Sequence, residues 1–211
     1  MRIDSGFFCH RVGWTDVRGR RFYEHPPQYQ ILHCLRHKAI GGSNFVVDGF
    51  YAAEILRERH PKEFEVLTKT PVPFQYIHDG RHAIQEHFTI GLKPAKLNGS
   101  RQEISYVNYS PHEQGPLPLS TPKEFYRALK LFAELLEDEK QTVRFNLEEG
   151  DAVMWDNRRI IHGRTGFRSR TEDEWKTSGL VKTKPGEPDR WLKGCYLGAD
   201  AVLDRVRALA K

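Results

Sequence analysis

The chain has 211 residues, a length that fits a single domain with a sizeable hydrophobic core. Its hydrophobic share of 38%, together with 17 glycines, lies close to the ~45–50% apolar content of globular proteins, which excludes a disordered chain. The net charge of +5 is spread along the sequence and no run approaches the ~18 apolar residues of a membrane span, so neither a nucleic-acid nor a membrane partner is expected.

The first half of the sequence predicts strands around two helices. Helical spacing runs over residues 49–59, and Pro61 interrupts it before a second short helix around residues 64–67. Short apolar runs bounded by turn residues predict strands. These runs cover residues 29–35, 44–48, 76–90 and 102–109. The first two runs flank Gly41 and Gly42, which predicts two strands around a turn.

A helix over residues 122–136 is the clearest local signal in the second half. Thr121 is expected to cap it, with Pro122 at the first helical position and Glu124 completing a Thr-x-x-Glu capping box. Apolar side chains then recur at helical spacing on a single stripe, which predicts a helix that lies against the core. They are Phe125, Leu129, Phe132 and Leu136.

The remaining segments predict a mainly β fold. Further short strands are expected at residues 142–147, 152–155, 159–162 and 191–197. The polar stretch over residues 168–188 predicts an insertion loop, and residues 201–209 predict a terminal helix. Many short strands with a few covering helices, and no linker or repeat, favour one jelly-roll or related barrel over a doubly wound sheet.

Several common catalytic signatures are absent, because the sequence has no glycine-rich phosphate loop, GxSxG elbow, HExxH or Cys-x-x-Cys motif. The cysteines at positions 9, 34 and 195 favour neither zinc nor a disulfide framework, and they indicate a reducing, intracellular compartment. One group of arginines is expected to form a solvated face rather than a phosphate-binding patch. It comprises Arg158, Arg159, Arg164, Arg168 and Arg170. A single histidine, His162, stands at the end of a predicted strand, where it is either a structural side chain or a ligand.

A series of short motifs runs from about residue 21 to the C-terminus. The motifs are Pro26-Pro27 with Gln30-Ile-Leu-His-Cys34, Gly41-Gly42, Val47-Asp48-Gly49-Phe50, Gly150-Asp151, His162-Gly163-Arg164 and Arg190-Trp-Leu-Lys-Gly-Cys-Tyr196. In order and approximate spacing they resemble the iron- and 2-oxoglutarate-dependent oxygenases of the taurine dioxygenase (TauD/TfdA-like) group. Within that group the similarity is to the γ-butyrobetaine and trimethyllysine dioxygenases. The resemblance implies their double-stranded β-helix, or jelly-roll, fold.

The resemblance also assigns roles to four residues. A non-haem Fe(II) site uses two His and one carboxylate, and His162 corresponds to the distal His, the catalytic metal ligand. Arg190 corresponds to the arginine that binds the far carboxylate of 2-oxoglutarate, since a guanidinium offers two parallel charge-assisted hydrogen bonds. Tyr196 matches an aromatic residue that holds a trimethylammonium group by cation–π attraction, and Asn108 matches a substrate-binding asparagine. The implied cofactors are Fe(II), 2-oxoglutarate as co-substrate, and ascorbate as reductant.

The sequence departs from the family where the other two iron ligands should lie. The family carries a His-x-Asp motif about nine residues before the Pro-Pro pair, and counting back from Pro26 arrives at residues 17–19, Val-Arg-Gly. A displaced triad of His10, Asp16 and His162 is the alternative that the sequence offers. Residues 1–20 are therefore expected to be a non-matching segment. Residues 21–211 are expected to be the C-terminal portion of an oxygenase domain, incomplete at its N-terminus, with an insertion at residues 168–188.

Three interpretations of function follow. The first is a γ-butyrobetaine dioxygenase-like hydroxylase of carnitine biosynthesis, and the second is a trimethyllysine dioxygenase; both act on a small trimethylammonium substrate. The third is a catalytically dead fragment that acts as a binding module or forms a homodimer. The break near residue 21 predicts a truncated product, a splice variant or an altered gene model that binds Fe(II) weakly and does not turn over γ-butyrobetaine. The expected compartment is the cytoplasm, with the mitochondrion as the alternative.

Overall fold

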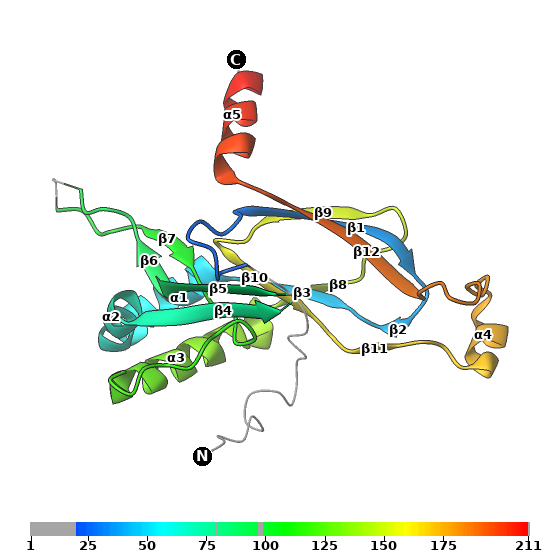
Figure 1. Ribbon diagram of the computed structural model, residues 1–211, viewed down its shortest axis with the longest axis horizontal. Helices are drawn as coiled ribbons and strands as arrows, with labels where there is room; N and C mark the ends of the chain where they lie inside the picture. Colours follow the sequence, from blue (N-terminus) through cyan, green and yellow to red (C-terminus); the bar gives the residue numbers. More distant parts are fainter. Residues whose placement is uncertain (1–19, 79, 97–98, 211) are drawn as a thin grey trace.

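The centre of the computed structural model is a pair of antiparallel three-stranded sheets (Figure 1). The structure describes residues 20–78, 80–96 and 99–210. The first sheet has the order β12 (Arg190–Leu197), β1 (Tyr29–His37), β9 (Ala152–Asp156). The second has the order β10 (Ile160–Arg164), β3 (Asn44–Asp48), β8 (Val143–Phe145). Each pairing joins segments that are far apart in the chain, as a jelly-roll arrangement requires, and the prediction of a mainly β fold with covering helices is confirmed.

Shorter strands form separate two-stranded sheets beside them. Three two-stranded pairs join β2 (Ile40–Gly41) to β11 (Phe167–Arg168), β4 (Pro71–His78) to β5 (Arg81–Phe88), and β6 (Ile90–Leu92) to β7 (Ile104–Val107). The helices are α1 (Gly49–Arg59), α2 (Pro61–Lys69), α3 (Lys123–Leu136), α4 (Glu172–Ser178) and α5 (Ala199–Leu209), with a 3-10 turn at Glu139–Gln141. Helices α1, α2 and α3 gather at one end of the molecule, and α4 lies at the other (Figure 1). No helix in the described ranges is long and apolar enough to cross a membrane.

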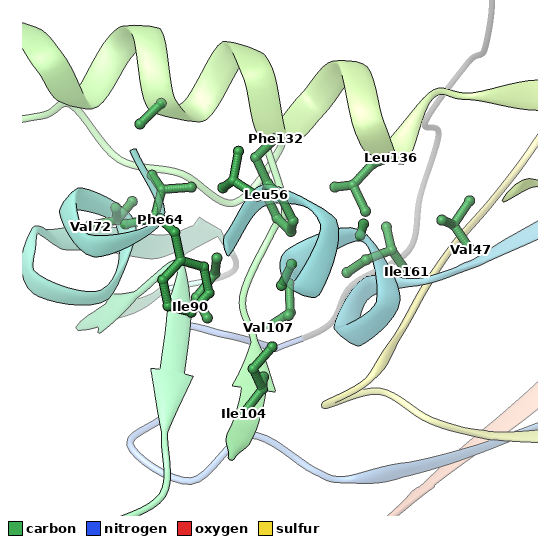
Figure 2. Packing of buried hydrophobic residues seen from close by; sticks show 14 of the residues in the cluster. Val47, Leu56, Phe64, Val72, Ile90, Ile104, Val107, Phe132, Leu136 and Ile161 are labelled. Carbon is green, nitrogen blue, oxygen red and sulfur yellow. The ribbon is translucent and has the colours of Figure 1, made fainter. Parts of the chain in front are cut away.

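The hydrophobic core lies among the three gathered helices, strands β4, β6 and β7, and one face of the second sheet. Phe132 and Leu136 point from α3 toward Leu56 of α1 (Figure 2). Val47 of β3 and Ile161 of β10 complete the same cluster from the sheet side. All five side chains are almost fully buried. The apolar stripe predicted for α3 therefore packs into the core as expected.

Two local predictions are wrong. Helix α3 begins at Lys123 after Pro122, which is extended at ψ 140° and makes no side-chain cap, so Thr121 is too far away to form the predicted box. A capping box does form at Thr171 and Glu174, where it starts α4 inside the stretch that was expected to be a loop.

The two strands predicted around the turn at Gly41 and Gly42 do form, but they do not pair with each other. Strand β1 belongs to the first sheet and β3 to the second. Both glycines have positive φ angles, 82° and 78°, which redirect the chain from one sheet to the other. A Cβ on Gly41 would lie 2.5 Å from the carbonyl oxygen of Gly166, so the crossing also requires close backbone approach.

Candidate functional site

A pocket of about 280 Å³ lies between the two sheets. The second sheet contributes Asn44, Val46, Phe145, His162 and Arg164, and the first contributes Gln30, Leu32, Trp155, Arg190 and Leu192. Phe45, Gly163 and Phe167 complete its lining. None of the lining residues is an Asp or a Glu, so the pocket combines apolar walls with amides, one imidazole and two guanidinium groups.

Strand alternation explains how the second sheet forms one wall of this pocket. Successive side chains of a strand point to opposite faces. Val47 and Ile161, which are paired in register, face the helical core, while their neighbours Val46 and His162, also paired, face the pocket. The same face of β10 carries Arg164, two residues beyond His162.

Gly163, between the two pocket residues of β10, is required by the packing of Phe45. A Cβ at this position would lie 2.4 Å from Cζ of the Phe45 ring. A side chain there would push the ring away, because real side-chain contacts do not approach so closely. Gly163 therefore lets the Phe45 ring pack directly over the backbone of β10.

The imidazole of His162 is a neutral base with one free nitrogen. Burial lowers its pKa to about 3, the positive charge of Arg21 lowers it further, and a hydrogen bond to the Ile160 backbone partly opposes both effects. Its Nε2 atom is buried and has no hydrogen-bond partner among the described residues, so Nδ1 makes the backbone bond. The ring centroid lies 4.4 Å from that of Trp155. An imidazole held in this way presents a lone pair to the pocket.

The guanidinium of Arg190 reaches the same pocket from the other sheet. One terminal nitrogen donates to the carbonyl oxygen of Gly42 at 3.3 Å, and the Nε atom is buried without a partner in the described part of the chain. A Cβ on Gly42 would lie 2.8 Å from that Nε, so this glycine leaves room for the arginine. Burial lowers the pKa of Arg190, and nearby Arg164 lowers it further, but the group stays charged at neutral pH.

Four lining residues leave polar atoms unpaired around the pocket. These atoms are Gln30 Oε1, Asn44 Nδ2, His162 Nε2 and Arg190 Nε, all buried and without a hydrogen-bond partner among the described residues. Most buried polar groups in folded proteins are paired, so four unpaired ones on one pocket indicate a polar ligand.

The structure brings together two of the four residues predicted for the site. His162 and Arg190, which are 28 positions apart in the sequence, line the same pocket. Tyr196 does not line it, and its ring is covered by the guanidinium of Arg20 with 4.8 Å between the guanidinium carbon and the ring centroid.

Asn108 occupies a structural position away from the pocket lining. Its side chain is 1% exposed. Its Oδ1 atom accepts hydrogen bonds from Arg21 and Arg158, and its Nδ2 atom donates to the carbonyl oxygen of Phe88. Both polar atoms of the side chain are thus engaged in structural contacts that tie the segments around Arg21, Phe88 and Arg158 together.

Sequence reasoning missed Arg164, Gln30 and Asn44. Arg164 was expected on a solvated face, yet it lines the pocket, and Arg158 is also largely buried beside Tyr106. Alternation alone could have placed Arg164, since it lies two residues after His162 on a strand. Alternation could not have identified Gln30 and Asn44 as pocket residues, because they lie on different sheets and no local pattern shows that these sheets face each other.

His162 meets the needs of one Fe(II) ligand, but the described residues do not complete a metal site. The neutral imidazole with a free Nε2 fits metal coordination. Across residues 20–78, 80–96 and 99–210, however, no group of three or more His, Cys, Asp or Glu side chains could hold a metal ion. The other members of the displaced triad, His10 and Asp16, lie outside the described residues.

The amino-acid sequence is similar to a family of known dioxygenases. The family model of the taurine catabolism dioxygenase TauD, TfdA family matches residues 15–196. A relative named dioxygenase str8, from Strobilurus tenacellus, is 42% identical over 89% of this chain and 41% of its own length. The human γ-butyrobetaine dioxygenase is 29% identical over 88% of this chain and 44% of its own, and the mitochondrial trimethyllysine dioxygenase of Bos taurus is 31% identical over 89% and 41%.

Solved structures agree on the fold. A taurine dioxygenase from Burkholderia xenovorans has a TM-score of 0.56 at 24% identity, covering 84% of this chain and 54% of that one. An asparagine oxygenase in complex with Fe(II), 3-hydroxyasparagine and succinate has a TM-score of 0.58 at 19% identity, covering 89% and 50%. The chain spans less than half the length of the curated relatives it matches.

Proposed function

Because this chain belongs to the TauD, TfdA family of Fe(II)- and 2-oxoglutarate-dependent dioxygenases, we propose that the pocket between its two sheets binds 2-oxoglutarate beside His162. One observation carries the proposal. The free Nε2 of His162 and the unpaired Nε of Arg190 belong to one pocket of about 280 Å³.

Each pocket residue has a separate task in this proposal. Arg190 binds a carboxylate of 2-oxoglutarate, which replaces the missing partner of its Nε and gains the strength of a charge-assisted hydrogen bond. His162 offers its Nε2 lone pair to the metal, and its low pKa keeps that lone pair available at neutral pH. Phe145, Trp155 and Leu192 surround the ligand with apolar surface and limit the access of water.

Binding of 2-oxoglutarate to the purified chain tests this proposal without turnover. Calorimetric titration in the presence of a chelator should detect binding, and Arg190→Gln should weaken it by roughly tenfold or more. Arg168→Gln is the matched control, because Arg168 pairs with Glu174 on the surface and does not line the pocket. Equal affinity of the Arg190→Gln variant and the wild-type chain would overturn the proposal.

The proposed substrate is a small trimethylammonium compound, as for the γ-butyrobetaine dioxygenase, with trimethyllysine as the alternative. Support comes from relatives that carry these substrates in their names, at 29% and 31% identity. The relative with 42% identity carries no substrate in its name, so a substrate screen must not stop at these two. Side-by-side succinate formation with γ-butyrobetaine and trimethyllysine distinguishes them, and a different preferred acceptor would reject both.

A catalytically dead binding or dimer-forming module is the second candidate. The observation that favours it is the lack of a three-ligand metal group in the described part of the chain. Anaerobic Fe(II) titration, followed by a succinate assay and sizing chromatography, separates the two. Iron-dependent succinate formation that is lost in His162→Ala supports the enzyme. A folded chain that binds 2-oxoglutarate but neither binds iron nor forms succinate supports the module.

A further inference from the structure

We propose that Arg164 is a second ligand-binding arginine of the pocket and that it makes the pocket selective for a ligand with two negative charges. The inference rests on the proposed function, because it concerns the same pocket. It adds a residue that recognises the co-substrate and a basis for selecting dicarboxylates over monocarboxylates.

The two guanidinium groups of the pocket pack against the same aromatic ring. The guanidinium carbon of Arg164 is 4.8 Å from the centroid of the Phe167 ring, and that of Arg190 is 5.3 Å from the same centroid. Both side chains also line the same pocket. They come from different sheets, Arg164 from β10 and Arg190 from β12, so they converge on the space between them.

Neither arginine has an acidic partner. Other arginines of the chain find carboxylates, as Arg159 does with Asp48, Arg168 with Glu174 and Arg144 with Glu139. Among the described residues, Arg164 and Arg190 form no ion pair. The guanidinium of Arg164 donates a hydrogen bond to the carbonyl oxygen of the adjacent Thr165 at 3.3 Å.

Two like charges without counter-charges leave the pocket with a strong positive potential. No lining residue is acidic, so the two guanidinium groups dominate the charge of the pocket. Partly buried like charges repel each other more strongly than charges in water. A ligand with two negative charges removes this repulsion and supplies acceptors to both groups, whereas a monocarboxylate neutralises only one.

The side-chain amide of Asn44 offers a further hydrogen-bond donor to the same ligand. Asn44 is the in-register partner of Arg164 across β3 and β10, and its buried Nδ2 lacks an acceptor in the described part of the chain. It therefore adds a neutral donor on the side of the pocket where Arg164 lies. Two cationic donors and an amide donor suit the oxygen-rich ends of a 2-oxo dicarboxylate.

A comparison of two ligands tests Arg164 directly. The ligands are 2-oxoglutarate and 2-oxopentanoate, which has the same carbon skeleton and one carboxylate fewer, and the measurement is calorimetric affinity in the presence of a chelator. The wild-type chain should prefer 2-oxoglutarate. Arg164→Gln should lower the affinity for 2-oxoglutarate by roughly tenfold and reduce that preference, while Arg164→Lys, which keeps the charge, should retain part of it.

The outcomes separate this inference from the proposed function. If Arg190→Gln weakens 2-oxoglutarate binding and Arg164→Gln does not, the inference is wrong and the proposed function stands. If neither variant changes binding, both are wrong. An equal loss for the two ligands in Arg164→Gln would show a general distortion of the pocket and would also overturn the inference. Arg168→Gln serves as the matched surface control, and circular dichroism establishes that every variant is folded.

Discussion

At the scale of single residues, the site depends on small and neutral groups as much as on charged ones. Gly163 has no side chain because Phe45 fills that space, and the adjacent His162 is kept uncharged by burial. The motif His162-Gly163-Arg164 suggested a ligand from its family resemblance alone. The structure adds a physical reason for each position. His162 has a free Nε2, Gly163 leaves room for the Phe45 ring, and Arg164 places a cation on the same face of the strand as the imidazole.

Replacement of Gly163 by alanine should destabilise the fold. The added Cβ would meet the Phe45 ring, and overpacking of this kind costs about 1–3 kcal/mol. Urea unfolding of Gly163→Ala measures the loss. Gly166→Ala is the control in the same segment, since a Cβ there would meet nothing within 4 Å. Equal stability of the two variants would contradict the packing role of Gly163.

A second prediction at the residue scale concerns Glu113, a mostly buried carboxyl beside Arg21. Burial raises the pKa of Glu113 above its usual 4.5, although the backbone N–H groups of Arg20 and Arg21 donate to it. The folded state therefore keeps a proton at a pH where the unfolded chain has lost it. The contribution of Glu113 to stability is highest in acid and falls as pH rises through the raised pKa.

Glu113→Gln removes this titration. Relative to the Gln variant, the wild-type chain should lose stability as the pH rises from about 4 to about 7. Unfolding by urea at several pH values in that interval provides the measurement. A stability difference that is constant with pH, or that moves in favour of Glu113 as the pH rises, would refute the assignment.

At the scale of secondary-structure elements, local chemistry determined which predictions succeeded. Helix α1 was predicted at residues 49–59 and forms there, because Asp48 caps it by accepting from two backbone N–H groups. The Thr-x-x-Glu pattern at Thr121 predicted a capping box that does not form, because Pro122 takes the N-cap position and the helix begins at Lys123. The same pattern at Thr171 was not used in the prediction, yet there the capping box forms and begins α4. Neighbouring residues decide whether such a pattern is used.

The turn that links the two sheets should control the position of Arg190. Gly42→Ala would place a Cβ 2.8 Å from the Arg190 Nε and would also strain a backbone with φ of 78°. Gly80→Ala suffers the same backbone strain at φ 71° but meets nothing within 4 Å. Both variants should lose about 1–2 kcal/mol of stability. Gly42→Ala alone should bind 2-oxoglutarate roughly tenfold more weakly in calorimetry, and equal affinities would exclude the steric effect.

At the scale of the whole molecule, the sequence predicted the fold class and most elements but not the partners of the strands. Strand β1 pairs with β9 and β12, which follow more than a hundred residues later, and no local pattern specifies such pairings. The same limit applies to the site. His162 and Arg190 were accessible through family motifs, whereas Gln30 and Asn44 required knowledge of how the two sheets face each other.

Removal of metal should leave the fold nearly as stable as before. The hydrophobic core lies among α1, α2, α3, strands β4, β6 and β7, and one face of the second sheet, and His162 is not part of it. Stabilisation by a ligand depends on its concentration relative to its affinity, and the described residues contain no three-ligand group that would bind a metal tightly. A thermal melt with and without a chelator should therefore show a shift of at most a few degrees. A large fall in Tm on chelation would show that the metal organises the fold.

The two faces of β3 and β10 have a consequence for how such a chain diverges. Val47 and Ile161 pack in the hydrophobic core, whereas Val46 and His162, one position away in each strand, line the pocket. Substitutions at alternate positions are thus exposed to separate selective pressures within a single strand. New ligand preferences can arise on the pocket face without loss of the core, and variation among natural homologues should follow a period of two along these strands.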